Sequence, residues 1–241
     1  MFKKNLRLVA VLLTVCLLLS LAGCSGNDNA VENKTTVEQP VLYQHPEITN
    51  PDQAKQLLID GNKRYVSGTL LKQDLGTQKR SDLVTKGQKP FAVVLTCSDS
   101  RVPAELLFDQ GLGDIFVVRV AGNVVDPVAL GSIEYGIEHL GSPLIVVMGH
   151  DSCGAVKATV EGGEAPGSIG AIVDKIKPSV EKAKKAGVPA DQLSAKSEDE
   201  NIAASVVAIE KSPIVKHLVE SGKVKIVSAK YKLASGEVSF F

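Results

Sequence analysis

The chain has 241 residues, 44% of them hydrophobic and 22% charged, a composition that suits one globular domain with attached segments. Its 27 basic residues balance its 27 acidic ones, which argues against nucleic acid as an electrostatic partner. The absence of tryptophan and the aromatic content of only 4% also argue against a surface on which bases stack.

Residues 1–24 are predicted to be the signal peptide of a bacterial lipoprotein. Basic residues precede a long apolar run, and the run ends in a Leu-Ala-Gly-Cys sequence whose last residue is Cys24. This sequence resembles a lipobox, in which the cysteine is acylated and becomes the new N-terminus after cleavage. A short transmembrane anchor and an ordinary signal peptide are the alternatives.

Residues 25–48 are polar, lack apolar periodicity and are expected to form a disordered tether. Residues 49–241 form the predicted domain. A lipidated Cys24 would hold this domain at the extracytoplasmic face of a cell membrane, or at an outer membrane if the envelope has two membranes.

The domain is predicted to begin with an amphipathic helix over 51–67, whose narrow apolar face suits dimerisation as readily as packing on its own core. A polar loop over 73–80 and a short helical turn over 82–86 are expected next. Further helices are expected at 103–108, 126–141, 153–160, 168–185, 201–209 and 212–222.

Strands are predicted between these helices. The first is hydrophobic almost throughout, which indicates burial on both faces, as in a parallel sheet. A C-terminal edge strand over 237–241 returns antiparallel after a turn. The chain is therefore expected to have an α/β fold with a mainly parallel central sheet flanked by helices; the other strands are expected at 91–96, 115–120, 143–148 and 224–231.

Two polar segments that follow strands carry the candidate chemistry. Cys97 follows the strand over 91–96, and His150 follows the strand over 143–148, with Cys153 three residues later. Open α/β sheets hold their sites at the carboxyl ends of strands. Two thiolates and one imidazole are three of the four ligands of tetrahedral zinc, and an open fourth position is typical of a catalytic site. A disulfide between the two cysteines is the competing hypothesis for an exported chain.

Asp99 and Arg101 stand next to Cys97 and allow several interpretations. Asp99 could be a fourth zinc ligand that closes the site, or it could accept a hydrogen bond from a zinc-bound hydroxide and orient it. Arg101 can hold the carboxylate in a bidentate ion pair, which favours the open site. An ion pair at the surface without a function is the third interpretation. Because thiolates donate charge to the metal, activity is expected to rise toward alkaline pH.

Together these segments resemble the β-class carbonic anhydrases, in particular their plant-like branch, over about 52–241. The resemblance implies reversible hydration of carbon dioxide to bicarbonate and a proton, with one zinc ion per subunit on Cys97, His150 and Cys153. It also implies a homodimer or a higher even oligomer with the active cleft at the subunit boundary. The matching segments are Cys97-Ser98-Asp99-Ser100-Arg101-Val102, Phe116-Val117-Val118-Arg119, Ala121-Gly122-Asn123, Ser132-Ile133-Glu134-Tyr135 and Gly149-His150-Asp151-Ser152-Cys153-Gly154.

The resemblance assigns five further residues to the cleft. Gln88 matches a glutamine that hydrogen-bonds the substrate from across the interface. Phe116 and Tyr135 match aromatic residues that wall the cleft, and His139 matches a proposed proton relay. Ala121 stands where the plant-like branch has a bulkier valine, so the carbon dioxide pocket is expected to be wider.

Two other functions stay open from the sequence. The same scaffold could hydrolyse carbon disulfide or carbonyl sulfide, because the zinc hydroxide chemistry is shared. A chain in which Asp99 closes the zinc shell permanently would be a non-catalytic, zinc-binding surface lipoprotein. Arg101 argues against this last function, since a structural site needs no partner to hold the carboxylate away from the metal.

Overall fold

The computed structural model describes residues 42–43 and 47–241. The predicted signal peptide, the lipidation site Cys24 and most of the predicted tether lie outside the described residues. The described residues belong to one compact unit, Pro40–Phe241. Along them, no helix combines the length and the apolarity required to cross a bilayer.

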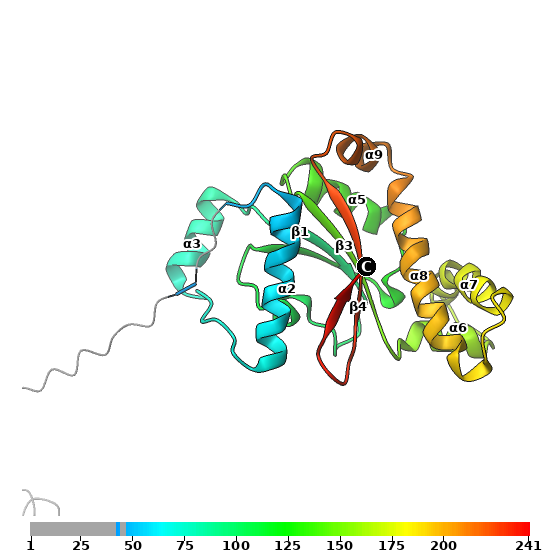
Figure 1. The fold of residues 1–241 in the computed structure, drawn as a ribbon. Helices are drawn as coiled ribbons and strands as arrows, with labels where there is room; N and C mark the ends of the chain where they lie inside the picture. Colours follow the sequence, from blue (N-terminus) through cyan, green and yellow to red (C-terminus); the bar gives the residue numbers. More distant parts are fainter. Residues whose placement is uncertain (1–41, 44–46) are drawn as a thin grey trace, which may run out of the picture. The chain divides into compact units, whose positions relative to one another are not determined.

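A five-stranded sheet in the order β2-β1-β3-β4-β5 forms the centre of the unit (Figure 1). The first four of these strands are parallel, and β5 pairs with β4 in the antiparallel direction. Every residue of β1 and β3 is buried, because helices cover both faces of a parallel sheet. The predicted α/β fold is confirmed; the strands are β1 (Ala92–Thr96), β2 (Ile115–Arg119), β3 (Leu144–His150), β4 (Lys225–Tyr231) and β5 (Val238–Phe240).

Alternate residues of the central strands point to opposite faces of the sheet. Val94 and Val146 pack under two helices, α2 and α4, while Val93 and Ile145 pack under α5, α8 and α9. Figure 1 shows α2 and α8 on opposite sides of the sheet. The bounds of these helices are α2 (Pro51–Ser67), α4 (Ala104–Leu107), α5 (Pro127–Glu138), α8 (Leu193–Glu210) and α9 (Pro213–Glu220).

A helical group extends the fold beyond the carboxyl end of β3 (Figure 1). It consists of α6 (Gly154–Glu161), α7 (Ile169–Lys185) and the first half of α8, with the short helix η2 (Ala190–Gln192) as a connection. Val156 of α6 and Ile176 of α7 are fully buried and share a cluster with Cys97 and Cys153. The two cysteines therefore lie against an apolar wall.

Two predicted boundaries are wrong for the same physical reason. The residues predicted to form a polar loop are partly helical, since α3 spans Thr77–Lys86. Helix α8 begins eight residues before the predicted start at 201. In α3 no residue is buried, and α8 buries polar residues such as Ser197 and Glu198, so neither segment shows the apolar periodicity on which the prediction depended.

The first helix of the domain lies on the chain's own sheet. Asn50 caps α2 by accepting hydrogen bonds from the backbone N–H groups of Asp52 and Gln53, and Ala54 and Leu58 are fully buried in the core beneath it. The narrow apolar face of α2 is thus buried against the core of its own chain. That the other faces of α2 contribute to dimerisation stays a prediction.

Candidate metal centre

The predicted ligands meet at the carboxyl ends of two neighbouring strands. Cys97 follows the last residue of β1, and His150 is the last residue of β3, which pairs with β1 in register. Cys153 is the N-cap of α6. The Sγ atoms of both cysteines and one ring nitrogen of His150 all lie within 4.8 Å of one another, and all three residues are buried. Both cysteines are free thiols, so the disulfide hypothesis is wrong.

The imidazole of His150 is oriented toward a metal. Its Nδ1 lies 2.8 Å from the carbonyl oxygen of Asp151, and donation of the Nδ1 hydrogen to that oxygen leaves Nε2 with a free lone pair. Nε2 is buried and has no hydrogen-bond partner among the described residues. Two thiols beside this nitrogen are the donor set that zinc prefers, with one coordination position left for a small molecule. The residues present therefore fit zinc.

The two thiols are electrostatically coupled. A hydrogen bond with Cys153 lowers the pKa of Cys97 to about 4 against the opposing effect of burial, and the same contact raises the pKa of Cys153. Backbone N–H groups of Asp99 (3.4 Å) and Gly122 (3.2 Å) also donate to the Cys97 Sγ atom. The pair thus loses one proton easily and holds the second tightly, so that a cation is needed to stabilise both thiolates.

Arg119 holds the loop that carries Cys97, a role that the sequence analysis missed. Its side chain donates to the carbonyl oxygens of Cys97 (Nε, 3.2 Å) and Asp99 (Nη2, 2.6 Å). The available signal was a cation at the end of the otherwise apolar strand β2. This contact ties the end of β2 to the ligand loop of β1.

Gly122 is required where it stands, in the short helix η1 (Ala121–Asn123). Its φ angle is +68°, and an added Cβ atom would lie 2.7 Å from Ile176 Cδ1. Asn201 of α8 donates to its carbonyl oxygen (2.6 Å). The N–H group that binds the Cys97 sulfur is therefore held from both sides. Ala121, predicted to line the substrate pocket, is the half-buried neighbour of Gly122.

Asp99 and Arg101 form the bidentate pair that the sequence allowed. Arg101 donates to both carboxylate oxygens, at 2.9 Å from Nε and 2.7 Å from Nη2, and its backbone N–H donates to Oδ1 at 2.9 Å. These bonds hold the pKa of Asp99 well below its usual range. Asp99 Oδ2 lies 3.9 Å from His150 Nε2. The carboxylate is adjacent to the three ligands but is paired with the guanidinium, which would leave the fourth position of a bound zinc ion to a small molecule.

Four residues assigned to the cleft lie away from the metal ligands of the same chain. Phe116 is the second residue of β2, and its ring lies 6.2 Å from that of Tyr135, which lies 5.2 Å from the ring of His139. Gln88 is exposed and precedes β1. Parallel strands all run from one edge of the sheet to the other, so these residues lie toward the amino ends of the strands and the metal ligands lie at the carboxyl ends. A single chain does not bring the two sets together.

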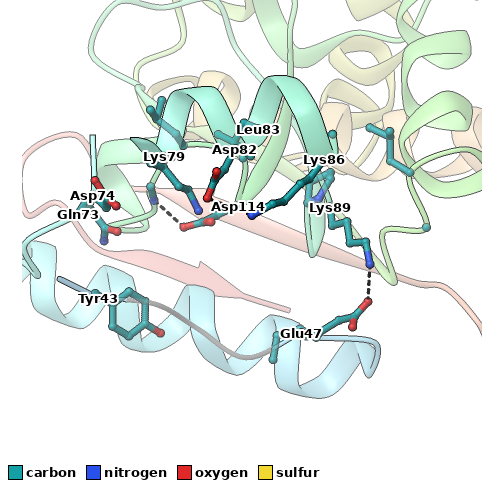
Figure 2. Close-up of a pocket in the computed structure, with 18 of the residues that line it drawn as sticks. Tyr43, Glu47, Gln73, Asp74, Lys79, Asp82, Leu83, Lys86, Lys89 and Asp114 are labelled. Carbon is teal, nitrogen blue, oxygen red and sulfur yellow. Dashed lines mark hydrogen bonds and ion pairs between the residues drawn. The ribbon is translucent and has the colours of Figure 1, made fainter. Parts of the chain in front are cut away.

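A cavity of about 880 Å³ opens at this amino end. It is lined by residues that precede β1, β2 and β3 and by α3, and its wall includes the neighbours of Gln88, Gly87 and Lys89. Figure 2 shows Lys79, Asp82 and Lys86 of α3 on one side and Glu47, which pairs with Lys89 at 3.2 Å, on the other. The cavity is remote from the metal ligands, because its lining residues next to the sheet stand just before strands, at the edge opposite to the ligands.

Comparisons with known proteins agree with this geometry. Residues 92–238 match the family model described as carbonic anhydrase. A carbonic anhydrase of Mycolicibacterium smegmatis is 46% identical to this chain over 195 residues, which span 79% of this chain and 93% of that protein.

Solved structures show the same fold. A Coccomyxa β-carbonic anhydrase in complex with acetazolamide superposes with a TM-score of 0.58 at 28% identity, covering 76% of this chain and 83% of that one. One of two tetrameric β-carbonic anhydrases from Sordaria macrospora superposes with a TM-score of 0.62 at 19% identity, covering 78% of this chain and 97% of that one.

The fold and the three buried ligands define a zinc protein of the α/β class. The chain belongs to the carbonic anhydrase family, and it has the fold of the β class.

Proposed function

We propose that this chain is a zinc-dependent carbonic anhydrase that interconverts carbon dioxide with bicarbonate and a proton. The observation that carries the proposal is the buried triad of Cys97, His150 and Cys153 in a chain that belongs to the carbonic anhydrase family. When bound, zinc supplies a Lewis acid that lowers the pKa of a water molecule toward neutrality. The protein supplies the position of that water molecule and the dry surroundings of the ligands.

Asp99 is the residue that orients the nucleophilic water. Its carboxylate is ionised and fixed by Arg101, so it accepts a hydrogen bond and holds the attacking lone pair toward carbon dioxide. The same pair argues against a permanently closed zinc shell, which a non-catalytic zinc protein would require. No contact in the described part of the chain favours a sulfur analogue over carbon dioxide.

A second copy of the chain completes the cleft in this proposal. Gln88, Tyr135 and His139 are exposed, and they lie at the end of the sheet remote from their own metal ligands. From a partner subunit, Gln88 would donate a hydrogen bond to the substrate, the aromatic rings of Phe116 and Tyr135 would wall the cleft, and His139 would pass the proton to buffer. The Sordaria macrospora relative is described as tetrameric.

Attachment to a membrane is also proposed, from the sequence alone. Acylation of Cys24 would anchor the domain outside the cytoplasm through the tether. Replacing Cys24 by serine should release the protein into the soluble fraction without a change in turnover. A Cys24→Ser protein that stays with the membrane would contradict the lipid anchor.

The activity is tested by stopped-flow measurement of carbon dioxide hydration, with zinc content measured on the same sample. We expect one zinc ion per chain and a rate that rises between about pH 7 and about pH 9 as the nucleophilic water loses its proton. A protein that is fully loaded with zinc but inactive across this range would contradict the proposed function.

A further inference from the structure

A buried carboxylate, paired with a partly buried lysine, contacts the backbone of the metal ligand Cys153. Glu198 of α8 is only 5% exposed. One carboxylate oxygen accepts a hydrogen bond from the backbone N–H of Cys153 at 3.2 Å, and the other lies 3.0 Å from the Lys230 ammonium on β4. The carboxylate therefore connects a lysine of the sheet to the backbone of a thiol ligand.

The turn that carries Cys153 depends on such a contact. Ser152 has a φ angle of +53°, a left-handed conformation that is unfavourable for a residue with a side chain. Cys153 is the N-cap of α6, so its own N–H group has no partner within the helix. The Glu198 carboxylate supplies that partner, and a charged acceptor makes the hydrogen bond stronger than a neutral one.

Lys230 keeps Glu198 in place. Its ammonium group also contacts Asp199 Oδ1 at 2.7 Å and the carbonyl oxygen of Ala195 at 3.3 Å. Burying a carboxylate without a countercharge is unfavourable, so an unpaired side chain at this position would turn toward water. The lysine thus fixes the direction in which the carboxylate points, which is toward Cys153.

The same face of α8 reaches the loop beside the other thiol. Asn201 and Ser205 follow Glu198 at helical spacing, and they donate to the carbonyl oxygens of Gly122 (2.6 Å) and Asn123 (2.9 Å). Gly122 is the residue whose N–H group binds the Cys97 sulfur. One helix face therefore touches the backbone on both sides of the metal site.

We propose that Glu198 is a positioning residue that sets the affinity of the site for zinc, by fixing the backbone of Cys153 through a hydrogen bond that Lys230 orients. The inference rests on the proposed function, because it requires zinc at the triad. Outer-shell partners of metal ligands typically change metal affinity by about 10- to 100-fold when they are removed. Glu198 acts in this way through the backbone of a ligand rather than through its side chain.

The experiment compares the wild-type chain with four full-length variants by competition for zinc with a chromophoric chelator and by the visible spectrum of the cobalt-substituted forms. Glu198→Ala removes the acceptor and should weaken zinc binding by about 10- to 100-fold. Glu198→Gln keeps an oxygen acceptor without the charge and should restore most of the affinity. Asp199→Ala is the matched control, because it removes another carboxylate partner of Lys230 that does not touch Cys153.

Glu198→Asp covers the case in which Glu198→Ala does not fold. It keeps the charge but shortens the side chain by one methylene, so zinc binding should weaken and the cobalt spectrum should shift while the metal-free protein keeps its melting temperature. The inference would be overturned if folded Glu198→Ala or Glu198→Asp bound zinc as tightly as the wild type. It would also be overturned if Asp199→Ala weakened zinc binding as much as the Glu198 variants do. A wild-type chain that does not bind zinc would overturn the proposed function, and this inference with it.

Discussion

The two ends of the central sheet are built in different ways. At the carboxyl end, Cys97, His150 and Cys153 are each less than 5% exposed, and the loops that carry them are held by Arg119 and by one face of α8. At the amino end, Gln88, Tyr135 and His139 are exposed, and no residue of the neighbouring helix α3 is buried. The carboxyl end forms a complete set of buried metal ligands within a single chain, whereas the amino end exposes polar and aromatic side chains.

This difference follows from what each end has to do. A tetrahedral metal site accepts little variation in the positions of its ligands, so the ligands need a rigid and dry environment within one chain. Cleft walls and a substrate hydrogen bond tolerate more variation, and a second subunit can supply them. The comparison predicts that changes at the carboxyl end affect the metal, whereas changes at the amino end affect only turnover.

The largest effect is expected from Cys153→Ala. Loss of a direct ligand should reduce zinc affinity by more than the roughly 100-fold typical of an outer-shell change and should abolish activity, as measured by zinc content after dialysis and by stopped-flow hydration. Ser179→Ala is the control, because it removes a buried side-chain oxygen outside the triad, one without a hydrogen-bond partner in the described chain, and it should keep zinc. Full zinc in Cys153→Ala would show that the triad does not hold the metal.

Arg101→Ala should separate metal binding from turnover. Zinc should be retained, and the hydration rate should fall by about 100-fold because Asp99 is free to leave its orienting position and move toward the metal. Folding should change little, since the Arg101 side chain is 55% exposed and exposed ion pairs contribute little stability. Lys232→Ala, which breaks an exposed pair with Glu237, should be active. A fully active Arg101→Ala protein would contradict the proposed role of the pair.

A mixing experiment tests whether the amino end works on the partner's metal. Gln88→Ala and Cys153→Ala proteins should each have low activity alone. After the two are unfolded and refolded together, mixed dimers should contain one complete site, which restores about a quarter of the wild-type rate for random pairing. A mixture of Cys97→Ala and Cys153→Ala chains, in which no chain has the full triad, should stay inactive. No recovery in the first mixture, with dimers present, would place Gln88 outside the partner's cleft.

The smallest effect at neutral pH is expected from proton competition for the ligands. Burial opposes protonation of His150, but the contacts of His150 with Cys97 and Asp151 outweigh burial and raise its pKa. The hydrogen bond between the two cysteines raises the pKa of Cys153. Protons therefore compete with zinc, and zinc affinity should fall as the pH is lowered. Chelator competition over a pH series measures this slope. Gln88→Ala should follow the wild-type curve, and a displaced curve would mean that the amino end also influences the metal.

Part of this organisation follows from local sequence. The apolar runs that precede Cys97 and His150 predicted the strands correctly, and with them the meeting of the ligands, because parallel strands end at one edge of a sheet. The ion pair of Asp99 and Arg101 was also accessible, since both residues lie within one short turn. The position of α3 and the true start of α8 were not accessible, because the contacts that stabilise those segments are polar or exposed.

The sequence by itself determined the type of fold, the identity of the metal ligands and the family, because all of these depend on short motifs and on which strands are apolar. Only the tertiary structure decided that the thiols are free and that Glu198 and Arg119 support the ligand loops. It also decided that Gln88 and Tyr135 lie far from their own metal site. These facts depend on strand order and on contacts between side chains that are far apart in the sequence. Such contacts cannot be predicted from residue spacing.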